Sequence, residues 1–218
     1  CFFIIFMSEL MRCPRIKVLV VGEENVGKSN IALRFTKDVF CRKGSQVIPS
    51  ELLCKTIEVP EKGFCQLDIN DPFGEDRFRD LTSSHYRYVD FVVIVCDVTN
   101  RDSFDALPRW IHEIQTLGPR TVSYLVVANK IDADKRLILQ EEGESFAAEH
   151  KCHYIEVSAM YNVNIQELFE LIATETLEKR SFLNPASPAP FKQQKSRKRT
   201  LSTDKLRKTI QAISPRVR

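Results

Sequence analysis

Short apolar runs alternate with longer amphipathic segments along this 218-residue chain, and the two patterns predict strands and helices. The runs at 91–96 and 124–128 are apolar throughout, which is typical of central parallel strands covered on both faces. The segments between the runs carry apolar residues at helical spacing. The predicted strands are 15–21, 51–59, 64–69, 91–96, 124–128 and one that ends in 156–159, and the predicted helices are 27–37, 103–117, 139–150 and 165–179.

This order of elements predicts one α/β domain. Strands that alternate with helices form a mostly parallel sheet with helices on both faces, and six strands are expected here. The strands at 51–59 and 64–69 alternate polar and apolar residues and are joined by the turn signal PEKG, which predicts a hairpin. We expect the domain to span 14–180, with an N-terminal extension at 1–13 and a basic disordered tail at 181–218.

Charge separates the tail from the rest of the chain. Residues 181–218 hold ten Lys and Arg against one acid, Asp204, a net charge of +9, while the remaining residues sum to −6. Apolar residues make up 43% and charged residues 28%, as in an ordinary soluble protein. The seven cysteines are scattered without zinc-ligand spacing. We interpret them as reduced thiols and expect a cytoplasmic protein.

The first seven residues (CFFIIFM) form an apolar run. A run of this length is too short to span a bilayer, which takes about 20 residues. It also lacks the basic region and cleavage site of a signal peptide. Two interpretations stay open: an over-extended gene model, with the true start at Met7 or Met11, or a membrane anchor.

The segment GEENVGKS at 22–29 fits the pattern G-x-x-x-x-G-K-[ST], and it follows a predicted strand and opens a predicted helix. Glycines let the backbone wrap around phosphate groups, so that N–H groups and the helix N-terminus face the negative charge. Lys28 is expected to reach the β- and γ-phosphates, and the Ser29 hydroxyl to bind Mg²⁺. The predicted nucleotide-binding residues here are Glu24, Asn25, Val26, Gly27, Lys28, Ser29 and Asn30.

A second motif, NKID at 129–132, follows the strand 124–128 directly. The carboxylate of Asp132 can accept hydrogen bonds from guanine N1–H and the 2-amino group, neither of which adenine offers. A site of this kind discriminates by a factor of about 10⁴. The segment EVSA at 156–159 is expected to bring a backbone N–H near guanine O6. The predicted residues of this base pocket are Asn129, Lys130, Asp132, Ser158, Ala159 and Met160.

Taken together, these motifs resemble the Ras superfamily of small GTPases, and most closely its Rab branch. The residues that carry the resemblance are GEENVGKS at 22–29, RFRDLTSSHYR at 77–87, VCDVTNRDSF at 95–104, NKID at 129–132 and EVSA at 156–159. It implies a P-loop NTPase fold (the small G domain), GTP or GDP as ligand, Mg²⁺, GTP hydrolysis and a role in membrane trafficking. It also implies effectors, an exchange factor and an activating protein. Phe40 falls where the family has an aromatic residue that stacks on guanine, although it could also be a core residue.

The chain departs from the family at the two switches. Val47 stands where the family has the threonine that binds Mg²⁺ and the γ-phosphate, and valine offers no oxygen. In the second switch Asp71, on the Mg²⁺ side, and Gly74, which meets the γ-phosphate, are retained. The glutamine that orients the attacking water is replaced by Glu75, the candidate catalytic residue. Glu24 in the phosphate loop replaces a small residue, which adds a second carboxylate near the γ-phosphate.

Further departures concern partners. The aromatic triad that Rab proteins present to effectors corresponds here to Leu52, Asn70 and His85. The last cysteine is Cys152, so the C-terminal prenylation cysteines of the family are absent. Two hypotheses follow: a slow GTPase with an altered switch, or a binding module in which the nucleotide is mainly structural. No nucleic-acid partner is expected.

The tail allows a first prediction. Residues 192–208 hold eight basic residues and one acid, which an anionic membrane attracts by about 1 kcal/mol per charge close to its surface. Stable anchoring takes two signals, and the tail offers only charge. A peptide of 181–218 should therefore co-sediment with anionic but not neutral vesicles, and moderate salt should release it. Binding that persists in high salt would contradict this, and no binding would favour nuclear import or a solvated linker.

Overall fold

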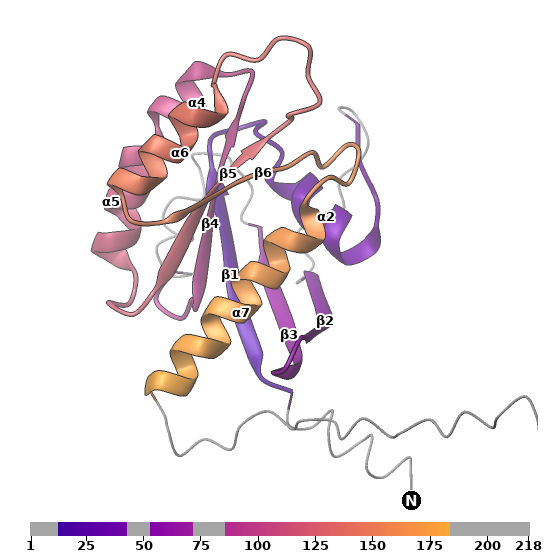
Figure 1. Ribbon diagram of the computed structural model, residues 1–218, viewed down its shortest axis with the longest axis vertical. Helices are drawn as coiled ribbons and strands as arrows, with labels where there is room; N and C mark the ends of the chain where they lie inside the picture. Colours follow the sequence, from indigo (N-terminus) through magenta and orange to yellow (C-terminus); the bar gives the residue numbers. More distant parts are fainter. Residues whose placement is uncertain (1–12, 43–52, 72–85, 184–218) are drawn as a thin grey trace, which may run out of the picture.

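The computed structural model describes residues 13–42, 53–71 and 86–183, and these form one sheet with helices on both faces (Figure 1). The sheet has six strands in the order β2-β3-β1-β4-β5-β6. The strands are β1 (Arg15–Gly22), β2 (Leu53–Val59), β3 (Gly63–Asn70), β4 (Phe91–Asp97), β5 (Ser123–Asn129) and β6 (His153–Glu156). The helices are α2 (Lys28–Lys37), α4 (Arg101–Asp105), α5 (Leu107–Leu117), α6 (Gln140–Glu149) and α7 (Ile165–Leu183).

All neighbouring strands are parallel except β2 and β3, which form the expected hairpin. Its turn needs a left-handed backbone at two positions, Glu61 (φ 63°) and Gly63 (φ 83°). The predicted α/β class, a mostly parallel six-stranded sheet covered on both sides, is therefore confirmed. Because parallel strands end at one edge, the carboxyl ends of β1, β4 and β5 lie side by side there.

Two apolar cores enclose the sheet. On one face α2 and α7 pack against the central strands, and the rings of Phe35 and Phe169 stack with centroids 3.9 Å apart. On the other face α4 and α5 bury Phe104, Leu107 and Ile114, and α6 lies beside them (Figure 1). Every residue of β4 is buried, as its continuous apolar run predicts.

The structure corrects two boundaries. The single helix predicted over 103–117 is two helices, α4 and α5, which meet at Ala106. Pro108 lies in the first turn of α5, and because it has no N–H it cannot continue the hydrogen bonds of a helix that began earlier. At the other end α7 continues to Leu183, three residues into the segment expected to be tail.

Two expectations on the ends of the chain lie largely outside the described residues: the extension at 1–13 and the tail at 181–218. Within the described ranges, none of the helices combines the length and the apolar character that a membrane span requires.

Candidate nucleotide-binding site

The phosphate loop at 22–29 leaves the carboxyl end of β1 and enters α2, as predicted. Two of its glycines are required by the backbone. Gly22 has φ +136°, and a Cβ there would lie 2.2 Å from the carbonyl oxygen of Val95. Gly27 has φ +99°, and a Cβ would lie 2.2 Å from Nδ2 of Asn129. The loop can therefore follow this path, with the N-terminus of α2 at its end, only with glycine at both positions.

The cationic group of the loop is Lys28, whose side chain is buried. Its Nζ donates to the carbonyl oxygens of Gly22 (2.9 Å) and Glu23 (2.7 Å). Burial lowers the pKa of Lys28, while the charges of Asp71, Glu23 and Glu24 raise it. An ammonium has three protons to donate, and the two carbonyls take two of them. Lys28 is thus held inside the loop with donor capacity left for a phosphate oxygen.

Ser29 and Asp71 meet beside Lys28 and supply oxygen atoms of the kind that Mg²⁺ prefers. Burial raises the pKa of Asp71, while a hydrogen bond to Ser29 and the charge of Lys28 lower it. Its Oδ1 is buried and has no hydrogen-bond partner among the described residues. No group of three or more His, Cys, Asp or Glu within those ranges could hold a metal. Ser29 and Asp71 thus place two oxygen-bearing side chains together beside Lys28.

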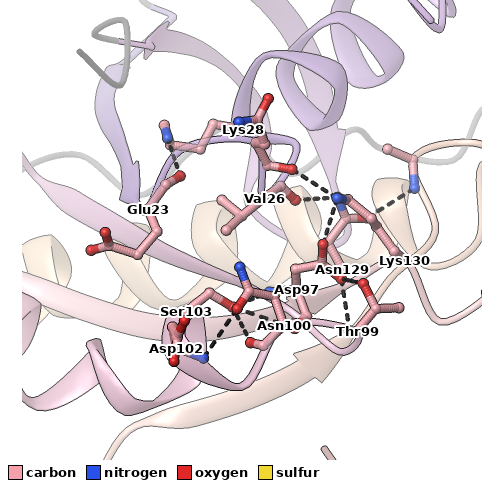
Figure 2. Close-up of polar contacts among 12 residues, drawn as sticks. Glu23, Val26, Lys28, Asp97, Thr99, Asn100, Asp102, Ser103, Asn129 and Lys130 are labelled. Atoms are coloured by element: carbon pink, nitrogen blue, oxygen red, sulfur yellow. Dashed lines mark hydrogen bonds and ion pairs between the residues drawn. The ribbon is translucent and has the colours of Figure 1, made fainter. Parts of the chain in front are cut away.

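Asn129 is the last residue of β5 (Figure 2). It joins the phosphate loop to the segment after β6 that contains Ala159 and Met160, here called the base loop. Asn129 is 2% exposed. The Nδ2 group donates to the carbonyl oxygen of Val26 at 2.8 Å, and Oδ1 accepts from the backbone N–H of Ala159 at 3.2 Å. One buried amide thus fixes the spacing between the phosphate loop and the segment that follows β6.

Lys130 makes the second connection and has a left-handed backbone with φ 65°. Its Nζ donates to the carbonyl oxygen of Asn25 at 2.7 Å and pairs with the carboxylate of Asp97, the last residue of β4. Asp97 is buried and also accepts from the backbone and hydroxyl of Thr99 (Figure 2). The Lys130 side chain therefore extends across the edge of the sheet, and its Nζ is held by both the phosphate loop and the end of β4.

Asp132, the residue predicted to recognise the base, is exposed, and the buried Ser158 holds its carboxylate in place. The Ser158 hydroxyl donates to Oδ1 of Asp132 and accepts from the backbone N–H of Tyr161 at 3.1 Å. A hydrogen bond to one oxygen leaves further lone pairs of the carboxylate for a ligand. Asp132 is thus an oriented acceptor that solvent can reach.

Some of the supporting residues had no signal in the sequence. Arg34 of α2 donates to the carbonyl oxygens of Ala159 (2.9 Å) and Met160 (3.1 Å), and these two hydrogen bonds hold the base loop against α2. Nothing in the spacing of α2 distinguishes this arginine from an ordinary exposed one. The side chain of Asn30, also predicted as a site residue, exchanges two hydrogen bonds with the backbone of Cys41.

The remaining predicted residues fare differently. Glu24 is exposed, and Phe40 is half-buried and packs against the core that α2 and α7 share. The second interpretation of Phe40, a core residue, therefore agrees with its contacts. Val47, Gly74 and Glu75 lie outside the described residues.

The mostly parallel sheet, with the phosphate loop between β1 and α2, defines an α/β domain of the P-loop kind. The model of the Ras family matches residues 17–178. Ras-related protein Rab-18-B of Danio rerio is 38% identical over 164 residues, 75% of this chain and 80% of that protein. GTP-binding protein YPT1 of Saccharomyces cerevisiae is 36% identical over 169 residues, 77% of this chain and 82% of that protein. The chain belongs to the Ras family and is close to its Rab members.

The Asn129 junction generates a prediction. Asn129→Ala leaves the Val26 carbonyl and the Ala159 N–H buried without their partner, at a cost of about 1–3 kcal/mol in the free energy of unfolding. Denaturant titration should show this loss. Gln166→Ala, which removes an exposed amide on α7, is the matched control and should change stability by less than about 0.5 kcal/mol. Equal effects of the two variants would show that the junction does not stabilise the domain.

Proposed function

We propose that the chain binds GTP and GDP together with Mg²⁺, hydrolyses GTP slowly, and acts through effector proteins in vesicle or membrane trafficking. The observation that carries this is the double connection between the two halves of the pocket, Asn129 to Val26 and Lys130 to Asn25. A phosphate site and a base site held at a fixed distance suit one ligand that carries both groups. Membership of a family whose members are GTPases supports the same proposal.

Guanine selectivity rests on Asp132. Its carboxylate is oriented by Ser158 and open to solvent, so it can accept from guanine N1–H and the 2-amino group. Adenine in the same position would leave the carboxylate without donors, so we expect the site to prefer guanine by a factor of about 10⁴. The backbone of Ala159 and Met160, held by Arg34, closes the pocket beside the base.

At the phosphate end, Lys28 would contact the β- and γ-phosphates, and Ser29 and Asp71 would bind Mg²⁺. When bound, the metal ion neutralises charge on the phosphates. The buried Oδ1 of Asp71 supports this assignment, because an unpaired buried carboxylate oxygen is costly unless a ligand satisfies it. Gly74, from the sequence pattern, would add a backbone N–H at the γ-phosphate.

Hydrolysis is proposed to be slow because the water-orienting glutamine is replaced by Glu75. A carboxylate acts as a base only if it is ionised and close to the water. Glu24 in the phosphate loop replaces a small residue of the family, so by this resemblance it adds a second negative charge near the γ-phosphate. Val47 also removes the threonine oxygen that would contact Mg²⁺ and the γ-phosphate.

The second candidate function is a nucleotide-stabilised binding module, and Val47 is the observation that favours it. A two-state protein responds to a ligand only through a difference in affinity between its states. Without the threonine contact, GTP and GDP differ less in the contacts that they would make with the protein. Partner binding that is equal with GDP and with a GTP analogue would select this module over the switch.

Partners and location are proposed from charge. An effector, an exchange factor and an activating protein are expected for the slow GTPase, whereas the binding module needs only its binding partner. The charge of the basic tail would attract it weakly and reversibly to anionic membranes. We therefore propose a cytoplasmic protein with transient membrane contact, and nuclear import is the alternative use of the tail.

A second prediction concerns selectivity. Asp132→Asn presents an amide donor where the carboxylate accepts, so preference should shift from guanine to xanthine nucleotides. Lys28→Ala should weaken every nucleotide and lower the melting temperature in the presence of GDP, since bound ligand stabilises by mass action. Competition against labelled GDP measures the first effect and thermal unfolding the second. If the wild-type protein bound ATP and GTP equally well, the assignment of Asp132 would be wrong.

A third prediction concerns the rate. Intact Ras hydrolyses GTP unaided at about 4 × 10⁻⁴ s⁻¹ with its glutamine in place. Single-turnover hydrolysis by this chain should be no faster. Glu75→Gln should raise the rate only when Glu24 is also replaced by a small residue, because the extra carboxylate opposes charge on the γ-phosphate. A wild-type rate well above that of Ras would rule out an impaired active site.

A further inference from the structure

One acidic residue of the phosphate loop, Glu23, reaches out of the loop to α5. Its carboxylate forms an ion pair with Arg109 and accepts a hydrogen bond from Nε1 of Trp110 at 3.0 Å. The guanidinium of Arg109 also lies over the Trp110 ring, 5.3 Å from its centroid. Figure 2 shows the Glu23 carboxylate directed away from the Lys28 ammonium, which contacts the Glu23 carbonyl oxygen instead.

The charge of Glu23 is felt at the phosphate site. Together with Asp71 and Glu24 it raises the pKa of Lys28 against the larger effect of burial. A loop that must surround a nucleotide triphosphate thus carries two carboxylates, Glu23 and Glu24. These two carboxylates would repel the negative charge of a bound phosphate group, and the repulsion grows with the charge of the ligand. A neighbouring cation that offsets one carboxylate would lower this cost.

The position of Arg109 is unfavourable for a cation within α5 itself. Arg109 lies in the first turn, after Pro108, where the helix dipole disfavours positive charge and the turn holds no acidic residue. The pair is also largely accessible to solvent, with 51% of the Arg109 side chain and 33% of the Glu23 side chain exposed. Ion pairs so accessible contribute little to the stability of a fold.

We propose that Arg109 is a positioning residue for phosphate binding: it holds the Glu23 carboxylate outside the cradle and offsets its charge, with Trp110 as the second donor. The affinity for the nucleotide then depends on the placement of α5, and more for GTP than for GDP. This inference rests on the proposed guanine-nucleotide binding.

The structure offers variants that separate charge from geometry. Glu23→Gln removes the negative charge but keeps an oxygen that Trp110 can bond. Arg109→Gln removes the offsetting cation. Arg101→Gln is the control, because Arg101 is exposed to a similar degree and pairs with Asp105 and Glu142 on another part of the surface.

The experiment is competition of GDP and a non-hydrolysable GTP analogue against a fluorescent GDP on the full chain at low and high salt. Arg109→Gln should weaken the GTP analogue about fivefold and GDP less, and high salt should shrink the effect to about twofold. Glu23→Gln should bind the analogue at least as tightly as wild type, and the double variant should match Glu23→Gln. The control should bind like wild type.

Trp110 supplies a second readout because it is the only tryptophan in the chain. Its fluorescence should change when nucleotide is removed and should respond to Glu23→Ala, which deletes its acceptor, more than to Glu23→Gln. Wild-type binding with no effect of Arg109→Gln would overturn the inference and leave the proposed function intact. So would equal losses in Arg109→Gln and Glu23→Gln, which indicate a structural contact. Failure of the wild type to bind any guanine nucleotide would overturn both.

Discussion

The buried amide of Asn129 is the contact on which the geometry of the pocket depends. Asn129 is the last residue of β5. Its amide donates a hydrogen bond to a carbonyl of the phosphate loop and accepts one from an N–H of the base loop. Gly27 has no Cβ because that atom would occupy the place of this amide. The glycine of one motif and the asparagine of another, 102 positions apart, are therefore a single packing constraint.

Much of the fold could be predicted because its signals are local. Continuous apolar runs predicted β4 and β5, and the turn signal PEKG at 60–63 predicted the hairpin. The break between α4 and α5 was missed, although Pro108 carries the signal, because apolar residues keep helical spacing across it. The spacing of apolar residues indicates which side of a segment faces the core. It does not reveal that one residue, a proline, lacks the N–H that a continuous helix needs.

The site was predictable where one motif supplies both backbone and chemistry, as with Lys28, Asn129 and Asp132. It was not predictable where a side chain from one element serves the backbone of another. Arg34 holds the base loop and Arg109 holds Glu23, across 125 and 86 positions of sequence. Neither arginine stands in a pattern, since a long cationic side chain on an amphipathic helix has an ordinary explanation at the surface.

The same division explains why binding and switching are separate questions in this chain. The groups proposed to recognise what GTP and GDP share, the base and the inner phosphates, are fixed by buried contacts such as those of Asn129 and Lys28. Groups that would recognise the γ-phosphate alone are Gly74, with Val47 and Glu75 at the altered positions. Affinity common to both nucleotides cannot shift an equilibrium between two conformations. A well-ordered candidate site is therefore compatible with either an inefficient switch or none, and under our proposal α5 adds a response to the charge that only the third phosphate carries.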